Sequence, residues 1–536
     1  MRNAVVEAHR LPDIPPLAWL LDLSAMDGPP VLYHGRHVDL FETGFVEGAW
    51  DGAFPDQAFD RSANVFGSGA KIGPDSVTFV TPSHTLEPLV AFGGVVSNSL
   101  AFLCAYRDLD LSGMDWRSGE RFASILLGLG DGPQTIRTGH GPLSVIYHHN
   151  FSMAPGGRLE VLPKPLPPAF PDFAAYRDHL LATARQVCAN AADPARARRY
   201  RPLTTLSSGY DSAAAAVLAK AAGCRSGISL RRSQRGESDS GLEVAAALGL
   251  ELREYERAVR GARGDFSEAQ FLSAGMQGED YVFTAFAETL EGSVLFTGFH
   301  GDKIWDRHQP PSDRIKRGDI SGCSLGEFRL ARDFVHLPVP FIGCRRHADI
   351  HRIANSAEMA PYSVGGSYDR PIPRRIAEEA GVPRDAFGQR KRATSLLIHR
   401  HPALLSEATS ADVAAFRRTL SIGLPDRVLI GLLSLRWHAG MALFRWFGRL
   451  QRLRGSRYKA VKYPRAVGRT CYAALSRMLG SAEVFEHGHP RNVVWQRWAV
   501  ARMKERYAVL GRRTVAAAGS PGAPGLGEAR ASPLGR

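Results

Sequence analysis

The sequence lacks the features that mark several specialised classes of protein. Six cysteines in 536 residues are too few for a disulfide framework, and neither a CxxC pair nor a Cys/His spacing typical of zinc sites occurs. We therefore expect a cytoplasmic protein with ordinary buried thiols. No secretory signal is expected, because the first apolar run, 17–23, is short and contains Asp22. The longer run 428–450 carries three arginines and a histidine, too much charge for a spanning helix.

Acidic residues are scarce only at the C-terminal end of the chain. Residues 411–536 contain 23 Lys and Arg against 6 Asp and Glu, whereas the first 410 residues contain 44 against 47. The basicity therefore belongs to the C-terminal part. It indicates either a solvated surface or contact with an acidic partner, of which a membrane surface is one candidate; a nucleic-acid partner is not expected.

Composition divides the chain into four stretches. Residues 1–170 are rich in Gly, Pro and short β-like runs, such as 76–80 and 143–147, and end in a proline-rich linker at 163–171. Residues 171–410 alternate between helical and strand patterns, which predicts a parallel α/β sheet. Its expected elements are helices at 176–187, 213–222 and 243–248, and strands at 202–206, 227–230 and 294–296. Residues 411–514 form a basic helical extension, and 515–536 are expected to be disordered, because 16 of those 22 residues are Ala, Gly, Pro or Ser.

One apolar stripe stands out in the C-terminal extension. Ile430, Leu433, Trp437, Met441 and Phe444 recur at helical spacing, with arginines beside them. The stripe predicts a helix packed on the rest of the protein. The alternative is a helix that lies on a membrane surface with an arginine flank.

The segment Ser207-Ser-Gly-Tyr-Asp-Ser212 lies between an expected strand and an expected helix. A turn of small residues there presents backbone N–H groups at the positive end of the helix dipole, where phosphate oxygens bind. Ser207, Ser208 and Ser212 add hydroxyl donors, and Gly209 allows close approach. Asp211 would repel a bare phosphate, so it indicates an intervening Mg²⁺. The segment is neither a Walker A loop nor a GxGxxG fingerprint, and its simpler interpretation is a capped helix start.

The same segment resembles the SGGxDS pyrophosphate loop of the ATP-pyrophosphatase (PP-loop) superfamily, and particularly asparagine synthetase and its relatives. Four later stretches resemble that family in the same order: 238–249, 292–302, 339–343 and 388–391. The resemblance implies a PP-loop domain that splits ATP between the α and β phosphates. A substrate carboxylate becomes an acyl-adenylate, and a nitrogen nucleophile then displaces AMP.

The resemblance also implies roles for individual residues. Ser207, Ser208, Gly209, Asp211 and Ser212 would cradle the pyrophosphate and Mg²⁺, and Thr297 and Gly298 would complete the ATP site. Asp302 would be the second metal-binding carboxylate, and Lys391 the catalytic cation that stabilises charge on the adenylate. Where asparagine-forming members carry glutamates, this chain has Phe299 and Lys303, which leaves the product open.

The N-terminal stretch resembles the glutaminase domain of asparagine synthetases at 47–54, 87–89, 97–100 and 154–159. That domain uses an N-terminal cysteine as its nucleophile, but here the first cysteine is Cys104. The resemblance therefore implies a degenerate glutaminase-like (Ntn-type) domain. The same loss occurs in β-lactam synthetases and lasso-peptide cyclases, whose nucleophile is an internal or substrate amine.

Together these features predict an ATP- and Mg²⁺-dependent ligase that forms an amide. Its substrates would be a small-molecule or peptide carboxylate and either an amine or ammonia, for which a partner protein is one source. Two alternatives remain: a PP-loop enzyme that modifies tRNA, and an ATP-binding scaffold without activity. The expected location is the cytoplasm, with peripheral membrane contact as the alternative.

Overall fold

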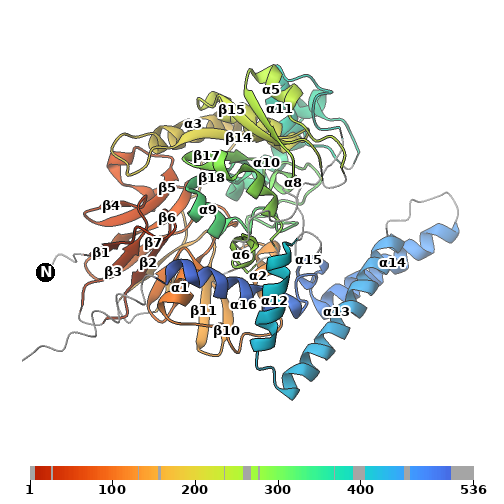
Figure 1. Ribbon diagram of the computed structural model, residues 1–536. Coiled ribbons are helices and arrows are strands. Elements are labelled where there is room, and N and C mark those ends of the chain that lie inside the picture. The colour runs from red at the N-terminus through yellow and green to blue at the C-terminus, as the bar shows by residue number, and fades with distance from the viewer. Residues whose placement is uncertain are drawn as a thin grey trace, which may run out of the picture.

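The computed structural model describes residues 6–25, 28–130, 132–154, 158–233, 236–257, 267–275, 278–366, 368–389, 405–451 and 459–508. The protein is a mixed α/β structure with three sheets, of which one is entirely parallel (Figure 1). The prediction of a parallel α/β sheet in the middle of the chain is therefore confirmed.

The N-terminal part contains two sheets that face each other. The first has the order β1-β3-β2-β9-β8-β11-β10 and is antiparallel apart from the β1–β3 pair. Its strands are β1 (Glu7–Arg10), β2 (Trp19–Asp22), β3 (Val31–His34), β8 (Leu89–Phe92), β9 (Val95–Ser97), β10 (Gln134–Thr138) and β11 (Gly141–Ile146). The second has the order β13-β12-β7-β6-β5-β4. Its strands are β4 (Asp39–Phe41), β5 (Gly44–Trp50), β6 (Val65–Ile72), β7 (Val77–Val80), β12 (Asn150–Met153) and β13 (Glu160–Leu162).

Aromatic side chains hold these two sheets together. Between the sheets, Trp19 of β2 packs edge-on against Phe45 of β5, with ring centroids 5.0 Å apart, and stacks on Phe79 of β7 at 6.4 Å. Within the second sheet, Phe79 stacks on Phe151 of β12 at 4.9 Å. All four side chains are fully buried. Such rings contribute both apolar area and directional contacts to a core. Helices α1 (Leu100–Tyr106) and α2 (Ser118–Phe122) follow in this part of the chain.

The parallel sheet has the order β16-β15-β14-β17-β18, so β14 is its central strand. The strands are β14 (Arg201–Leu206), β15 (Ser226–Leu230), β16 (Glu251–Tyr255), β17 (Ser293–Thr297) and β18 (Phe334–Pro338). The helices of this part are α3 (Phe173–Ala191), α4 (Tyr210–Ala221), α5 (Leu242–Leu248), α6 (Glu268–Leu272), α7 (Ala287–Leu290), α8 (Gly301–Ile304), α9 (Gly326–Arg332), α10 (His347–Ala354) and α11 (Pro371–Glu379). Every residue of β17 and β18 is buried, as expected for a parallel sheet that is covered on both faces.

A buried ion cluster joins the N-terminal sheets to the parallel-sheet part. Arg329 of α9 donates to both carboxylate oxygens of Glu47 at 2.8 Å and to Glu87 at 2.5 Å. Burial raises the pKa of Glu87, and the Arg329 guanidinium opposes that rise. Two of the stretches that resemble a glutaminase domain, 47–54 and 87–89, therefore supply carboxylates to this junction.

The C-terminal part is helical, as predicted. It contains α12 (Glu407–Thr419), α13 (Leu424–Gln451), α14 (Lys459–Leu479), α15 (Ala482–Phe485) and α16 (Arg491–Lys504). Helix α16 returns to the N-terminal part, where Tyr507 stacks on Phe102 of α1 with ring centroids 4.6 Å apart. Helices α13 and α14 form a hairpin that projects from the rest of the protein (Figure 1).

The predicted linker and apolar stripe both bury side chains. Residues 163–171 contain no helix or strand, as predicted, but Lys164 and Phe170 are buried. In the stripe, Phe444 packs against Phe485 of α15 and Tyr472 of α14.

No helix in the described parts of the chain is both long enough and apolar enough to cross a membrane. The predicted disordered tail, 515–536, lies outside the described residues.

Candidate nucleotide site

The predicted phosphate loop occupies the junction between the central strand β14 and helix α4. Ser207 Oγ lies 2.7 Å from Ser212 Oγ and accepts the backbone N–H of Gly209 at 3.2 Å. The loop is therefore tied to the first turn of α4 by its own hydroxyls. The first N–H groups of a helix have no partner within that helix, so this end of α4 can bind an anion.

Ser208 has a different environment from the other two serines. Its hydroxyl donates to Asp239 Oδ1 at 2.8 Å, and its carbonyl accepts the backbone N–H of Gly388 at 2.8 Å. Ser208 does not line the cavity at this end of the sheet. Its contacts join the loop to the segments around residues 239 and 388, which are distant in the sequence.

A cavity of about 410 Å³ opens beside the loop. The volume is within the range of small-molecule sites. The predicted residues that line it are Ser207, Gly209, Asp211, Ser212, Thr297, Gly298 and Asp302. Apolar side chains cover another part of the wall: Ile228 and Leu230 of β15, with Val282, Phe283 and Phe286. Hydroxyls and carboxylates thus share one cavity with an apolar surface that suits a planar base.

Asp211 forms an ion pair that the sequence did not predict. Its carboxylate accepts from the guanidinium of Arg370, the residue before α11. The Arg370 side chain is 4% exposed and that of Asp211 19%. Burial disfavours the charged guanidinium, but nearby carboxylates, Asp211 foremost, raise the pKa of Arg370 above its ordinary value. Arg370 also lies over the ring of Tyr368, 4.9 Å from its centroid.

Two glycines after β17 allow the next loop to pack directly on Asp211. A Cβ at Gly298 would lie 2.5 Å from the backbone carbon of Asp211, and one at Gly301 would lie 2.4 Å from its Cγ. Real Cβ atoms essentially never make such contacts. This close packing brings Asp302, at the start of α8, to the same cavity as Asp211.

His300, between those glycines, has a strained backbone. Its φ is 73°, in the left-handed region that non-glycine residues rarely adopt, and its ring stacks on Phe341 with centroids 4.7 Å apart. Burial, followed by repulsion from Arg317, lowers the pKa of His300 well below its ordinary value, so the ring is neutral at pH 7. Strain of this kind persists where the surrounding structure enforces it, which is common at functional sites.

The carboxylates fit the metal expected with ATP. Among the described residues, no group of three or more His, Cys, Asp and Glu side chains could hold a metal ion by itself. Mg²⁺ usually takes one or two protein carboxylates and completes its shell with water and substrate phosphates, which matches Asp211 and Asp302 beside a phosphate loop. The Arg370 guanidinium competes with a metal for Asp211, and it would also pair with a phosphate there.

Lys391, the predicted catalytic cation, lies outside the described residues. The chain that leads to it is fixed at the loop by the Gly388–Ser208 hydrogen bond. A Cβ at Gly388 would lie 2.4 Å from the Tyr210 ring, and the φ of Gly388 is 67°. Both features require glycine at this position.

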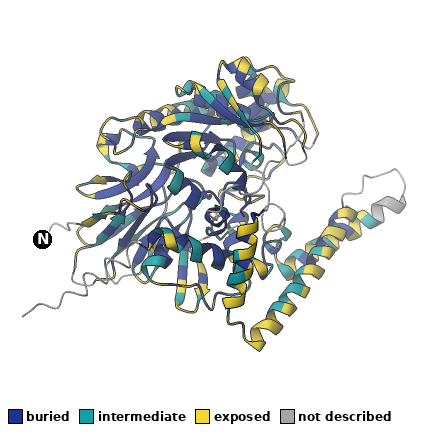
Figure 2. Ribbon diagram, in the orientation of Figure 1, coloured by how far each residue is buried: buried dark blue, intermediate teal, exposed yellow. Residues whose placement is uncertain are grey.

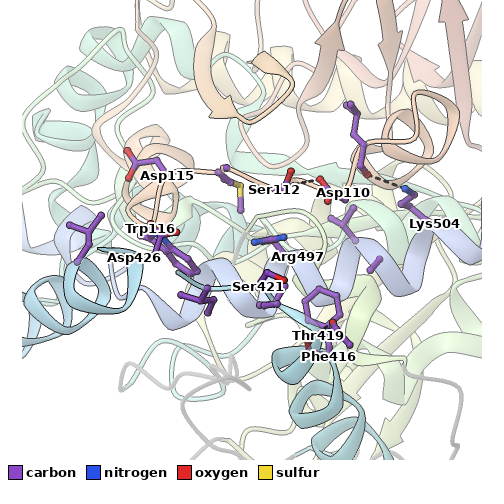
Figure 3. A pocket seen from close by; sticks show the side chains of 18 residues that line it. Asp110, Ser112, Asp115, Trp116, Phe416, Thr419, Ser421, Asp426, Arg497 and Lys504 are labelled. Carbon is purple, nitrogen blue, oxygen red and sulfur yellow. Dashed lines mark hydrogen bonds between the residues drawn. The ribbon is translucent and has the colours of Figure 1, made fainter. Parts of the chain in front are cut away.

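A larger cavity, of about 690 Å³, lies elsewhere in the protein (Figure 3). It is enclosed by the segment 109–116, the α12–α13 connection and α16. Two of its charged groups already have protein partners: Lys504 contacts Asp108, and Asp110 contacts His140 and the Ser112 backbone. It has no strand-to-helix loop at its wall, so the smaller cavity is the candidate nucleotide site.

In comparisons with known proteins, the chain matches no family model and no curated protein.

Proposed function

We propose that this protein is an ATP-dependent, amide-forming ligase of the asparagine synthetase type. The observation that carries the proposal is that Asp211 and Asp302 line one cavity with the hydroxyls of Ser207 and Ser212. The cavity lies at the carboxyl ends of the neighbouring strands β14 and β17. Ligands of open parallel sheets bind at this edge.

In the proposed reaction, a carboxylate oxygen attacks the α-phosphorus of ATP, and the bond to the pyrophosphate breaks. A nitrogen nucleophile then attacks the acyl carbon, loses a proton, and AMP leaves. Loop hydroxyls and the N-terminal turn of α4 would bind the departing pyrophosphate, and Arg370 would pair with its charge. Asp211 and Asp302 would hold Mg²⁺, which supplies charge neutralisation when bound. Lys391 would stabilise charge that grows on the carbonyl and phosphate oxygens.

The nitrogen source is proposed to be free ammonia or an amine, and not glutamine hydrolysed by this chain. Cys104, the first cysteine of the sequence, is fully buried in α1. Burial raises the pKa of its thiol to about 12, so almost none of it is thiolate at neutral pH.

The direct test is the fate of ATP. Purified protein is incubated with MgATP and a panel of carboxylic acids, and AMP, ADP and pyrophosphate are quantified along with carboxylate-dependent exchange of labelled pyrophosphate into ATP. The proposal expects AMP and pyrophosphate, with exchange stimulated by at least one acid. Stoichiometric ADP would contradict it. ATP binding without turnover across the panel would favour an inactive scaffold, and turnover that requires added tRNA would favour the tRNA-modifying alternative.

A matched pair of variants separates this site from the larger cavity. Asp302→Asn removes a carboxylate from the proposed metal site, and Asp426→Asn removes one from the wall of the larger cavity. We expect loss of turnover in the first variant and normal turnover in the second. The opposite pattern would move the active site to the larger cavity.

A further inference from the structure

The hairpin of α13 and α14 has one face that is already packed. Phe444 contacts Phe485 and Tyr472, and Trp437 Nε1 donates to the carbonyl of Glu486 at 3.1 Å. Gly440 packs against the Phe485 ring, where a Cβ would lie 2.7 Å away. These contacts fix which side of α13 faces inward and which side faces solvent.

The outward side of α13 carries a second row of apolar residues. Its large members are 41–75% exposed and recur at steps of three, four and eight residues along the helix: Leu424, Val428, Leu432, Leu435, Leu443 and Trp446. With 3.6 residues per turn, those steps place them along one side of the helix. In Figure 2, exposed residues, coloured yellow, recur along this projecting hairpin. An apolar row of this length on a projecting element marks an interaction surface.

Basic residues flank the apolar row. Arg427 and Arg445 each directly precede a member of the row, and Arg449 follows one turn after Trp446, so the three are offset to one side of it. All three are exposed, and no ion pair of theirs occurs within the described residues. By contrast, Arg436 on the inward side pairs with Glu120 at 3.2 Å.

The charge of the hairpin is strongly positive. Residues 424–479 contain 12 Lys and Arg, and Asp426 is their only acidic residue. We propose that the outward face of the α13–α14 hairpin docks on an anionic lipid surface. The Leu and Trp side chains enter the headgroup boundary, and the arginines contact lipid phosphates, as in amphipathic helices that lie in the membrane plane. The row is mainly aliphatic, whereas surfaces that bind single-stranded nucleic acid stack successive bases on aromatic side chains.

The test uses the full-length protein and vesicle flotation. Vesicles of phosphatidylcholine alone are compared with vesicles containing roughly one third phosphatidylglycerol, at salt from about 0.1 M to about 1 M. We expect binding to the anionic vesicles that weakens as salt rises, and little binding to the neutral ones. No binding to anionic vesicles at low salt would overturn the proposal.

Variants then assign the binding to this face. Leu432→Ser with Leu435→Ser should weaken binding about 100-fold, since burial of each leucine contributes about a factor of ten. Arg445→Gln with Arg449→Gln should weaken it about 30-fold and flatten the salt dependence. Leu242→Ser is the matched control, because Leu242 of α5 is 56% exposed but lies on the parallel-sheet part. An equal loss in the control would overturn the assignment.

Two further measurements exclude other occupants and unfolding. If sedimentation shows that wild type is a dimer and the leucine variants are monomers, and wild type does not bind vesicles, then a second copy covers this face and the proposal is wrong. Preference for nucleic acid over anionic vesicles would refute it equally. All substituted side chains are exposed, so unchanged circular dichroism and unchanged ATP turnover are expected. The vesicle assay requires no ATP, so its outcome is independent of the proposed ligase activity.

Discussion

The ion pair of Asp211 and Arg370 predicts an unusual result for Asp211→Asn. If Asp211 acted only through a metal, the asparagine variant would be inactive but as stable as wild type. The structure gives this carboxylate a second role, because it balances a guanidinium that is 4% exposed. Removing it leaves Arg370 charged and buried, with Asp302 as a more distant carboxylate.

The size of the effect follows from the burial of the pair. Breaking a buried ion pair from one side typically costs 3–5 kcal/mol. Asp211 is partly exposed and Tyr368 still covers Arg370, so we expect the low end, about 3 kcal/mol of unfolding free energy. Replacing both partners, as in Asp211→Asn with Arg370→Met, should restore most of that stability, because no uncompensated charge remains. The double variant should stay inactive.

Urea unfolding and AMP formation would be measured on the same preparations. The control for stability is Asp178→Asn, which breaks an exposed pair with Arg177 and should cost well under about 1 kcal/mol. Unfolding of Asp211→Asn at the wild-type urea concentration, or a double variant less stable than the single one, would contradict this prediction. Either result would mean that Arg370 does not depend on Asp211 in the folded protein.

Three further predictions test other parts of the protein. Lys391→Ala should lower kcat by about 100–1,000-fold with little change in MgATP affinity, as measured by initial rates and titration. Gly301→Ala should displace the Asp211 carboxylate and reduce AMP formation strongly, whereas Gly326→Ala, with open space around its Cβ, should have normal rates. Burial lowers the pKa of His336 to about 3, so below about pH 6.5 the unfolded chain binds a proton that the folded chain does not. As the pH falls from about 7.5 to about 5.5, this group should therefore lower the unfolding free energy of wild type by about 1.4 kcal/mol. In urea titrations, His336→Gln should lack that contribution. An identical pH dependence of stability in both proteins would contradict the prediction.

The sequence predicted the parts of the site that depend on local structure. Strand β14, the small-residue loop and helix α4 are contiguous, and each follows from composition: a buried strand, a Ser/Gly turn and an alanine-rich run. Asp302 was predictable because it follows the buried strand β17 by a few residues. Parallel strands end at the same edge of the sheet, so two separate motifs could be assigned to one cavity.

The partners of these residues were not predictable, because they come from distant segments. Arg370 is 159 positions from Asp211 in the sequence. It directly precedes a proline, and no other feature of the surrounding sequence indicates a site. Asp239, which accepts from Ser208, lies in the stretch 238–249, whose resemblance to the family assigned no contact to this aspartate. Which side chains meet across a fold is decided by tertiary packing, and one sequence carries no direct record of that packing.

Helix α13 shows why one apolar pattern can hide another. The stripe through Trp437 and Phe444 has helical spacing, and the structure packs it against α14 and α15. The row through Leu432 and Leu435 has the same spacing. The stripe and the row together therefore place apolar residues around most of the helix. A helix that is apolar on two sides gives a weak amphipathic signal, because the two contributions cancel in any single direction. The structure separates them, because one row packs against α14 and α15, with Phe444 buried, and the other row is exposed. The other row then stands as an exposed surface beside arginines, and an interaction partner accounts for it better than core packing does.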